Sequence, residues 1–384
     1  MNWPSRRSHA TPLTRSLAPV VAYALLSGIA AWAAADTFAD PVAPDVRLGL
    51  PHIAVPADDP LTPAKVTLGR MVFFDKRLSG DNTISCASCH VPEKGYTDGL
   101  PLALGIGGRL GSRKTPSLLN VGLSTSAFWD GRRPSLEAQA LDPLFNPREH
   151  GLTDRATLIQ LLRGDPVYRG AFRRAFGTEA DAITLEHLGQ AVASFERTLW
   201  AAGSPFDRYE YAGDRLALSA AAQRGLTLFR GRAQCAVCHT LGEGSASFSD
   251  EQFHSLGVGF GKIAPRLGQI ATRVANSPPD VLDKLILSDA DIAELGRFNV
   301  TKQPADIGKF KTPSLRNVAV TGPYMHDGSV RTLDEAVDAE VYYRSVEANH
   351  PLILSPAEKS DLVEFLKSLT SPYASTLADD KSQP

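Results

Sequence analysis

The chain has 384 residues, of which 43% are hydrophobic and 21% charged, with 40 Lys and Arg against 42 Asp and Glu. This apolar content supports a packed interior and excludes a wholly disordered chain. A net charge of −2 lacks the basic footprint of a nucleic-acid-binding protein, so we expect no nucleic-acid partner, and the length suggests about two domains.

Residues 1–35 have the pattern of an export signal. Arg6, Arg7 and Arg15 precede an uncharged apolar run at 16–33, and alanines follow directly before residue 36. This order is typical of a cleaved secretory signal, and an uncleaved anchor helix is the alternative. No later stretch is long and apolar enough to span a bilayer, so we expect a periplasmic protein without a membrane span after signal cleavage.

Helical spacing dominates the rest of the chain, after a Pro-rich extended lead at 36–60. Five segments carry apolar residues three and four positions apart, and each has a Ser, Thr or Asp that can cap a helix. These predicted helices are 63–75, 155–163, 185–199, 217–229 and 356–368, with candidate caps Thr62, Asp154, Thr184, Ser219 and Ser355. Long stretches rich in Gly, Pro and Ser lie between them, at 99–117 and 240–266, and strand patterns are scarce. The sequence therefore predicts a mainly α fold with long loops.

The chain also contains an internal repeat. A Gly-x-x-x-Phe step leads twice into Cys-x-x-Cys-His, as Gly69 and Phe73 with CASCH at 86–90, and as Gly225 and Phe229 with CAVCH at 235–239. The string TPSLLN at 115–120 recurs as TPSLRN at 312–317, and in both copies an Asp-Gly pair begins 14 residues after the Pro. We therefore predict two similar domains, at 61–205 and 206–375, with a longer loop inserted after the second Cys motif and a tail at 376–384.

Cys-x-x-Cys-His is the attachment signature of a c-type haem. Two cysteines one helical turn apart can both reach the vinyl groups of one porphyrin, and the adjacent His presents its imidazole to the iron. A redox dithiol and a Cys/His zinc site are the alternatives, but neither explains a His after each second Cys. The motifs use all four cysteines of the chain. The sequence thus predicts two covalently bound haem c groups, attached through Cys86, Cys89, Cys235 and Cys238, with His90 and His239 as iron ligands.

Over about residues 60–370 the chain resembles the bacterial di-haem cytochrome c peroxidases and their MauG-like relatives. The resemblance rests on the two haem motifs and on the strings TPSLLN, FWDGR, SLEAQA, DPLFNPRE and KTPSLRNVAVTGPYMHDG. It implies two cytochrome-c-like domains with one haem each. The N-terminal haem would be the peroxide site, and the C-terminal haem would receive electrons.

The resemblance also implies roles for four residues near the N-terminal haem. Glu149 would be the distal carboxylate that moves a proton between the two peroxide oxygens, as general base and then as general acid. Gln139 would line the same pocket, Pro143 would wall its distal face, and Trp129 would relay electrons between the haems. A surface position for Glu149, a solvated amide for Gln139 and plain aromatic packing for Trp129 are the alternatives.

The sequence departs from the family pattern before FWDGR. Many members carry a His in this loop that caps the peroxidatic iron, whereas this chain has no His between His90 and His150. The resemblance therefore implies a five-coordinate N-terminal haem that is always open, as in MauG.

Two further positions concern metal ligation. For the sixth ligand of the second haem we favour Tyr342, in a Tyr-x-Arg sequence that resembles the MauG-like pattern, and the alternatives are Tyr343, Met325 and His350. The family's calcium site uses an Asn where this chain has Lys114, together with backbone carbonyls at positions that match Thr321 and Pro323. An ammonium cannot ligate a cation, so Lys114 argues against calcium.

These features predict a periplasmic di-haem oxidoreductase that uses hydrogen peroxide as oxidant in a cytochrome c peroxidase-type reaction. A small exported redox protein, either a cytochrome c or a copper protein, would supply the electrons. One alternative is MauG-like oxidation of a side chain on a partner protein. A further alternative is a non-catalytic di-haem electron carrier.

Overall fold

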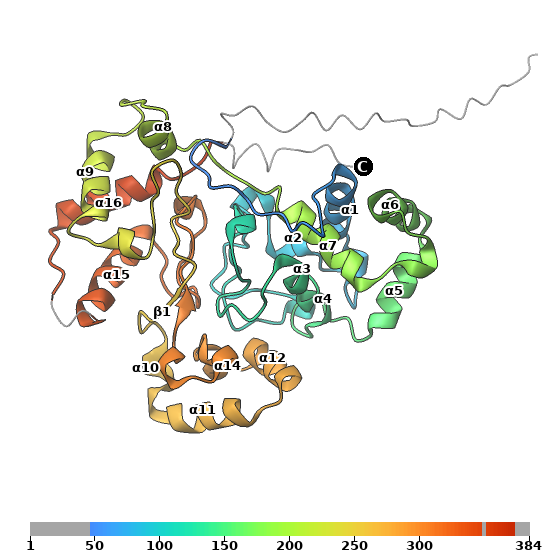
Figure 1. Ribbon diagram of the computed structural model, residues 1–384. Coiled ribbons are helices and arrows are strands. Elements are labelled where there is room, and N and C mark those ends of the chain that lie inside the picture. Colours follow the sequence, from blue (N-terminus) through green and yellow to red (C-terminus); the bar gives the residue numbers. More distant parts are fainter. Residues whose placement is uncertain (1–46, 348–350, 373–384) are drawn as a thin grey trace, which may run out of the picture. The chain divides into compact units, whose positions relative to one another are not determined.

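The computed structural model describes residues 47–347 and 351–372 (Figure 1). The predicted signal, most of the predicted lead, His350 and the predicted tail lie outside these residues. The prediction of a mainly α fold is confirmed. The helices are α1 (Pro63–Phe74), α2 (Cys86–Cys89), α3 (Leu136–Gln139), α4 (Asp142–Phe145), α5 (Arg155–Gly164), α6 (Pro166–Phe176), α7 (Leu185–Glu196), α8 (Pro205–Tyr211), α9 (Ala220–Arg230), α10 (Phe260–Ile263), α11 (Leu267–Asn276), α12 (Pro279–Ser288), α13 (Ala290–Ala293), α14 (Phe298–Thr301), α15 (Leu333–Glu347) and α16 (Pro356–Lys367). The strands are β1 (Phe253–His254) and β2 (Phe310–Lys311), and short 3-10 turns occur between the elements.

All five predicted helices are present, as α1, α5, α7, α9 and α16. The five predicted caps are confirmed, because the side chains of Thr62, Asp154, Thr184, Ser219 and Ser355 accept backbone N–H groups at the helix starts. The structure also contains helices that the apolar spacing did not predict, among them α6, α11, α12 and α15. For α6 the end signals are clear, since Asp165 caps its start and Gly177 follows its end in the left-handed region.

The two copies of the repeat build the same helix crossing. In the first copy α1 packs against α7, and in the second α9 packs against α16. A Cβ on Gly69 would lie 1.9 Å from the carbonyl oxygen of Ala191, and a Cβ on Gly225 would lie 2.0 Å from that of Asp361. Glycine is therefore required in both copies, because the helices approach backbone to backbone.

An aromatic pair lies beside each crossing. The rings of Phe73 and Phe195 are 5.0 Å apart in the first copy, and those of Phe229 and Phe365 are 4.9 Å apart in the second. All four side chains are buried in apolar clusters that also include a Cys of the adjacent haem motif. Each motif is thus held on its own hydrophobic core. The bounds of the two predicted domains remain a prediction.

The predicted long loop after the second Cys motif is instead largely helical. It contains α10 to α14 (Figure 1). Their apolar side chains form a separate cluster that includes Ile263, Val274 and Ile292. Strands β1 and β2 pair in antiparallel fashion on either side of this helical insertion, with Phe253 opposite Lys311. None of the helices in the described part of the chain combines the length and the apolar character that crossing a bilayer requires.

Candidate active site

The first haem motif forms one helical turn. α2 spans Cys86–Cys89, and a capping box between Ser85 and Ser88 stabilises its start. Residues three apart on a helix share a face, so the two free, half-buried thiols can serve one ligand. The backbone N–H of His90 donates to the Cys86 carbonyl oxygen at 2.9 Å and thereby fixes the imidazole next to the thiols.

Both motif histidines are oriented for iron. His90 Nδ1 lies 3.0 Å from the carbonyl oxygen of Tyr96, and His239 Nδ1 lies 2.9 Å from that of Phe248. A carbonyl oxygen can only accept, so Nδ1 carries the proton in each ring and Nε2 has a free lone pair. Burial lowers the pKa of His90 and lowers that of His239 to about 4, which keeps both imidazoles neutral. A neutral imidazole is the form that binds a metal.

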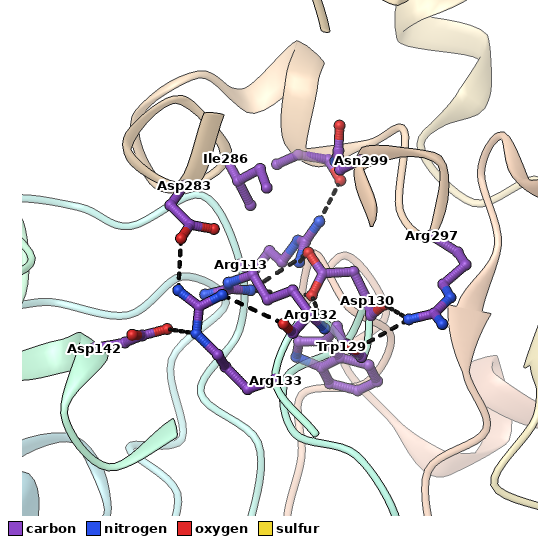
Figure 2. Close-up of polar contacts among 12 residues, drawn as sticks. Arg113, Trp129, Asp130, Arg132, Arg133, Asp142, Asp283, Ile286, Arg297 and Asn299 are labelled. Atoms are coloured by element: carbon purple, nitrogen blue, oxygen red, sulfur yellow. Dashed lines mark hydrogen bonds and ion pairs between the residues drawn. The ribbon is translucent and has the colours of Figure 1, made fainter. Parts of the chain in front are cut away.

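A cluster of arginines lies around Asp130, next to Trp129 (Figure 2). Arg113 and Arg132 contact the fully buried Asp130 carboxylate at 2.7 and 3.1 Å. Burial alone would raise the pKa of Asp130, but Arg132 and Arg113 lower it to about 2. Two guanidinium groups on one carboxylate leave an excess positive charge, and the Nε atoms of both arginines are buried without a hydrogen-bond partner among the described residues. These unpaired donors suit the carboxylates of a haem, so the donor set fits the predicted cofactor.

The helical insertion reaches the same cluster. Arg133 bridges Asp142 of α4 at 2.8 Å and Asp283 of α12 at 2.5 Å (Figure 2). Arg113 donates to the backbone oxygen of Ala293, and Arg297 donates to that of Asp130. The segment that contains FWDGR is therefore anchored to the insertion from several sides.

Glu149 lies near the first haem motif although it is distant in the sequence. Its backbone N–H donates to Asn146 at 3.1 Å, and its carbonyl oxygen accepts from Ile106 at 2.8 Å. Burial raises the pKa of Glu149 to about 7, against the lowering effects of Arg132 and Asn146. After burial itself, the Glu149 carboxyl is the largest cause of the raised pKa of the Cys89 thiol. The structure thus brings a carboxyl that titrates near neutrality to the edge of the motif.

The other expected pocket residues lie on the two short helices before Glu149. Gln139 is the half-buried last residue of α3, and Pro143 lies in the first turn of α4. The Pro143 carbonyl oxygen accepts from the backbone of His150 at 3.1 Å and so holds the chain beside Glu149. His150 is 4% exposed, and its Nδ1 contacts the backbone oxygen of Leu78 at 3.0 Å.

Trp129 connects equivalent positions of the two repeats. Its indole Nε1 donates to the carbonyl oxygen of Lys114 at 3.0 Å, and its own carbonyl oxygen accepts from the backbone of Lys311 at 2.8 Å. Lys114 and Lys311 precede the two copies of Thr-Pro-Ser-Leu. Trp129 is therefore held to both copies of this string, by its indole to the first and by its backbone to the second, and its role as a relay stays a prediction.

The residues at the family's calcium position do not fit calcium. Lys114 is 5% exposed, and its ammonium donates to the Thr115 carbonyl oxygen at 3.1 Å and to Thr97 Oγ1 at 3.3 Å. Burial lowers the pKa of Lys114 to about 8, while Asp98 acts in the opposite direction. The side chain at the expected Asn position is thus a hydrogen-bonded ammonium, which cannot ligate a cation.

Tyr342, the favoured sixth ligand, lies on α15. Its side chain is 64% exposed, and its ring contacts that of Tyr343 edge to face with centroids 5.2 Å apart. Glu340 and Arg344, one helical turn apart, are the α15 residues that act on the second motif, because both influence the pKa of Cys235. The assignment of Tyr342 to the iron stays a prediction.

Two buried groups near these sites were not predicted from the sequence. Glu196, at the end of α7, is 5% exposed, and Arg316 forms a buried ion pair with Asp207 at 2.9 Å. A signal for Glu196 does exist, since it follows the buried Leu188 and Val192 at intervals of four along α7. For Arg316 the only signal is that Arg replaces Leu119 of the first repeat.

The fold and the paired motifs define a di-haem c-type protein, and the comparisons with known proteins specify the family. A family model of the di-haem cytochrome c peroxidases matches residues 63–215. The methylamine utilization protein MauG of Methylorubrum extorquens is 38% identical over 336 residues, which cover 85% of this chain and 84% of the relative. The cytochrome-c peroxidase IdrP1 of Denitromonas iodatirespirans is 36% identical, and 96% of each chain is covered.

A solved structure gives the same result. The crystal structure of a MauG-like protein associated with microbial copper homeostasis matches with a TM-score of 0.71 and 32% identity, over 89% of this chain and 100% of that chain. The chain therefore belongs to the di-haem cytochrome c peroxidase family, and the resemblance seen in the sequence is confirmed. It is an oxidoreductase of the peroxidase type.

Proposed function

We propose that this protein reduces hydrogen peroxide in the periplasm, at the haem held by Cys86, Cys89 and His90, with Glu149 as the group that moves the proton. The observation that carries this proposal is the position of Glu149. Its carboxyl lies beside the first motif and titrates at about 7. A general base and acid works best when its pKa is near the working pH.

The residues of the first repeat supply the binding and the electrostatics. The Cys86 and Cys89 thiols would form the covalent links, His90 would supply Nε2 to the iron, and Arg113 and Arg132 would pair with the carboxylates of the haem. The haem, when bound, supplies the redox chemistry that amino-acid side chains lack. Peroxide takes up two electrons and two protons to give two molecules of water. Glu149 accepts the proton of the peroxide oxygen that binds, and then delivers it to the oxygen that leaves as water.

The first haem is open to peroxide without prior activation in this proposal. The loop between the first motif and FWDGR contains no His. His150, the imidazole nearest to Glu149 in the sequence, is buried with Nδ1 on the Leu78 carbonyl oxygen. The second motif, with His239, would hold the haem that supplies electrons, and the Trp129 indole would be the relay between the two motifs.

The source of the electrons gives two versions of the reaction. In the first, a small exported cytochrome c or copper protein reduces the second haem. In the second, a side chain of a partner protein is oxidised instead, and the similarity to the methylamine utilization protein MauG and the missing loop His support this version. Both versions share the peroxide chemistry at Glu149, so one experiment tests their common step.

The test compares Glu149→Gln with Glu186→Gln, an exposed carboxyl of α7, by stopped-flow mixing of the ferric protein with peroxide. We expect the rate constant of Glu149→Gln to fall by about 10²–10⁴-fold and that of Glu186→Gln to stay at the wild-type value. Burial raises the Glu149 pKa, so the basic form is lost as the pH falls through about 7. The wild-type rate should therefore decrease below that pH, and the Gln variant should show a flat profile. A fast reaction of Glu149→Gln with an unchanged pH profile would refute the role of Glu149.

A further inference from the structure

A second buried carboxyl lies at the first haem motif and takes no part in the chemistry proposed above. Glu196 is 5% exposed, and its Oε2 has no hydrogen-bond partner among the described residues. The adjacent Arg197 pairs instead with Glu137 of α3, at 2.6 Å. A buried carboxyl without a donor is strongly disfavoured in its charged form.

Glu196 lies at the edge of the motif where α7 ends. Its carboxyl is, after burial, the largest cause of the raised pKa of Cys86, ahead of the neighbouring Cys89 thiol. The preceding Phe195 packs on Phe73, whose ring centroid is 6.4 Å from that of His90. Since Cys86 is a point of covalent attachment, the carboxyl lies close to the rim of the first haem.

The second repeat has a leucine at this position. Phe195 and Phe365 are equivalent residues of the two repeats. A Cβ on Gly69 would lie 2.9 Å from the Phe195 Cβ, and a Cβ on Gly225 would lie 2.8 Å from the Phe365 Cβ. The next residues, Glu196 and Leu366, therefore correspond. Leu366 is 8% exposed and belongs to the apolar core of the second repeat. The helix crossing thus does not need a carboxyl here, and the acid is specific to the first repeat.

The surroundings place the titration of Glu196 in the accessible range. Burial raises its pKa to about 8, Arg197 opposes this shift, and Glu137 adds to it. The titratable groups around its end of α7 are Glu137 on α3, Cys86 and Cys89 on α2, Arg70 on α1, Arg197 directly after α7, and Glu149, which also acts on Cys86. Lys65 of α1 lies at the other end of α7, over the Phe176 ring. Lys65 pairs with Asp59 at 2.6 Å. α6 packs on α7 at that other end, where its Phe176 stacks on His187.

We propose that Glu196 holds the proton that accompanies electron transfer at the first haem. When one electron from the exported redox donor reduces this haem, the site loses one positive charge, and the Glu196 carboxylate takes up one proton from solvent. Oxidation releases the electron and the proton again. Leu366 cannot do this, so the second haem exchanges electrons without a proton. The inference depends on a haem at the first motif but not on peroxide chemistry or on Glu149.

The test is a spectroelectrochemical titration of both haems in the holoprotein between pH 6 and pH 10. We expect the midpoint potential of the first haem to fall with rising pH, towards one proton per electron, and that of the second haem to stay level. Glu196→Gln keeps the shape but cannot ionise, and Glu196→Leu copies the second repeat. Glu149 also titrates beside this motif, so all variants are compared in a Glu149→Gln background. There both Glu196 variants should remove the slope at the first haem, and Glu186→Gln, an exposed carboxyl of the same helix, should retain it.

A second readout does not depend on the potentials. The redox difference infrared spectrum of the wild type should contain a protonated carboxyl band, which disappears in Glu196→Gln. In the Glu149→Gln background, a slope that survives in both Glu196 variants, or an equal slope at the second haem, would overturn the inference. Because potentials can be measured without turnover, a failure of the Glu149 experiment would leave this result intact, and the reverse also holds.

Discussion

The two repeats of the molecule have the same scaffold but different buried charges around their haem motifs. In both, the proximal imidazole of His90 or His239 donates Nδ1–H to a carbonyl oxygen at about the same distance. Each repeat also has an asparagine with a left-handed backbone, Asn120 or Asn317. Its side-chain oxygen accepts a backbone N–H at 2.8 Å, from Ala201 after α7 or from Ser371 after α16. These contacts have nearly the same length in the two halves.

The two repeats differ in the titratable side chains that lie beside their Cys motifs. The first motif has two carboxyls beside its thiols, the half-buried Glu149 and the buried Glu196, and desolvation raises the pKa of both. At the second motif, burial is the main cause of the raised pKa of Cys235, and Glu340 and Arg344 act on it in opposite directions. The two copies of one scaffold therefore present different titratable side chains to their Cys motifs, and this difference is the basis of the proposed proton exchange at the first motif alone.

The largest expected effect comes from removing each proximal ligand in turn. His90→Gly should abolish the reaction of the ferric protein with peroxide, a greater loss than the about 10–100-fold that is typical when only a ligand-orienting group is removed. His239→Gly should leave this reaction in place and abolish steady-state turnover with a reduced cytochrome c. Added imidazole should restore part of each activity, which separates ligand loss from misfolding. If His239→Gly instead stopped the peroxide reaction, the two haems would have to exchange roles.

The next effect concerns the buried ion pair of Arg316, whose position is occupied by Leu119 in the first repeat. Arg316 binds both carboxylate oxygens of Asp207 at 2.9 Å, and both side chains are almost fully buried, at 1% and 0% exposed. Arg316→Met leaves the Asp207 charge uncompensated and should lower the free energy of unfolding by about 3–5 kcal/mol. At the equivalent position of the first repeat, Leu119→Met keeps the volume and should cost less than about 1.5 kcal/mol.

Denaturant unfolding of the holoprotein, followed by far-ultraviolet circular dichroism, measures both changes. Adding Asp207→Asn to Arg316→Met removes the isolated charge and should recover part of the loss. Equal effects of Arg316→Met and Leu119→Met would show that the ion pair does not stabilise the second repeat.

Local sequence patterns predicted the parts of the fold that depend on neighbours along the chain. The caps at Thr62 and Ser355 and the helices that follow them have signals within a few residues, and Cys-x-x-Cys-His is itself a local motif. The proximity of Glu149 to Cys89 came from the family resemblance, because no local pattern connects residues so far apart in the sequence. The burial of Glu196 could have been suspected from its helical spacing, but its missing donor could not.

The helical insertion shows the same limit. Its helices α11 and α12 carry buried residues such as Val274 and Ile286. The stretch nevertheless follows a loop rich in Gly and Ser, so the whole segment was predicted as a longer loop. Local sequence patterns could not predict the partner of Arg316 either, since Asp207 lies 109 residues earlier in the chain. The tertiary partners of charged groups are therefore the part of the site that the sequence alone could not predict.

The smallest expected effect tests the feature that the repeats share. A Cβ at Gly69 or Gly225 would meet a backbone oxygen at 1.9 or 2.0 Å, so Gly69→Ala and Gly225→Ala must push two helices apart. Overpacking of this kind typically costs about 1–3 kcal/mol, and the nearly equal geometry predicts nearly equal losses in the free energy of unfolding. The displaced helix differs, however, because α7 ends at Glu196, whereas α16 carries Leu366. Gly69→Ala should therefore also change the pH dependence of the first haem's potential, while Gly225→Ala lowers stability alone. Losses that differ several-fold would mean that the two helix crossings contribute unequally to the free energy of unfolding, although their geometry is nearly the same.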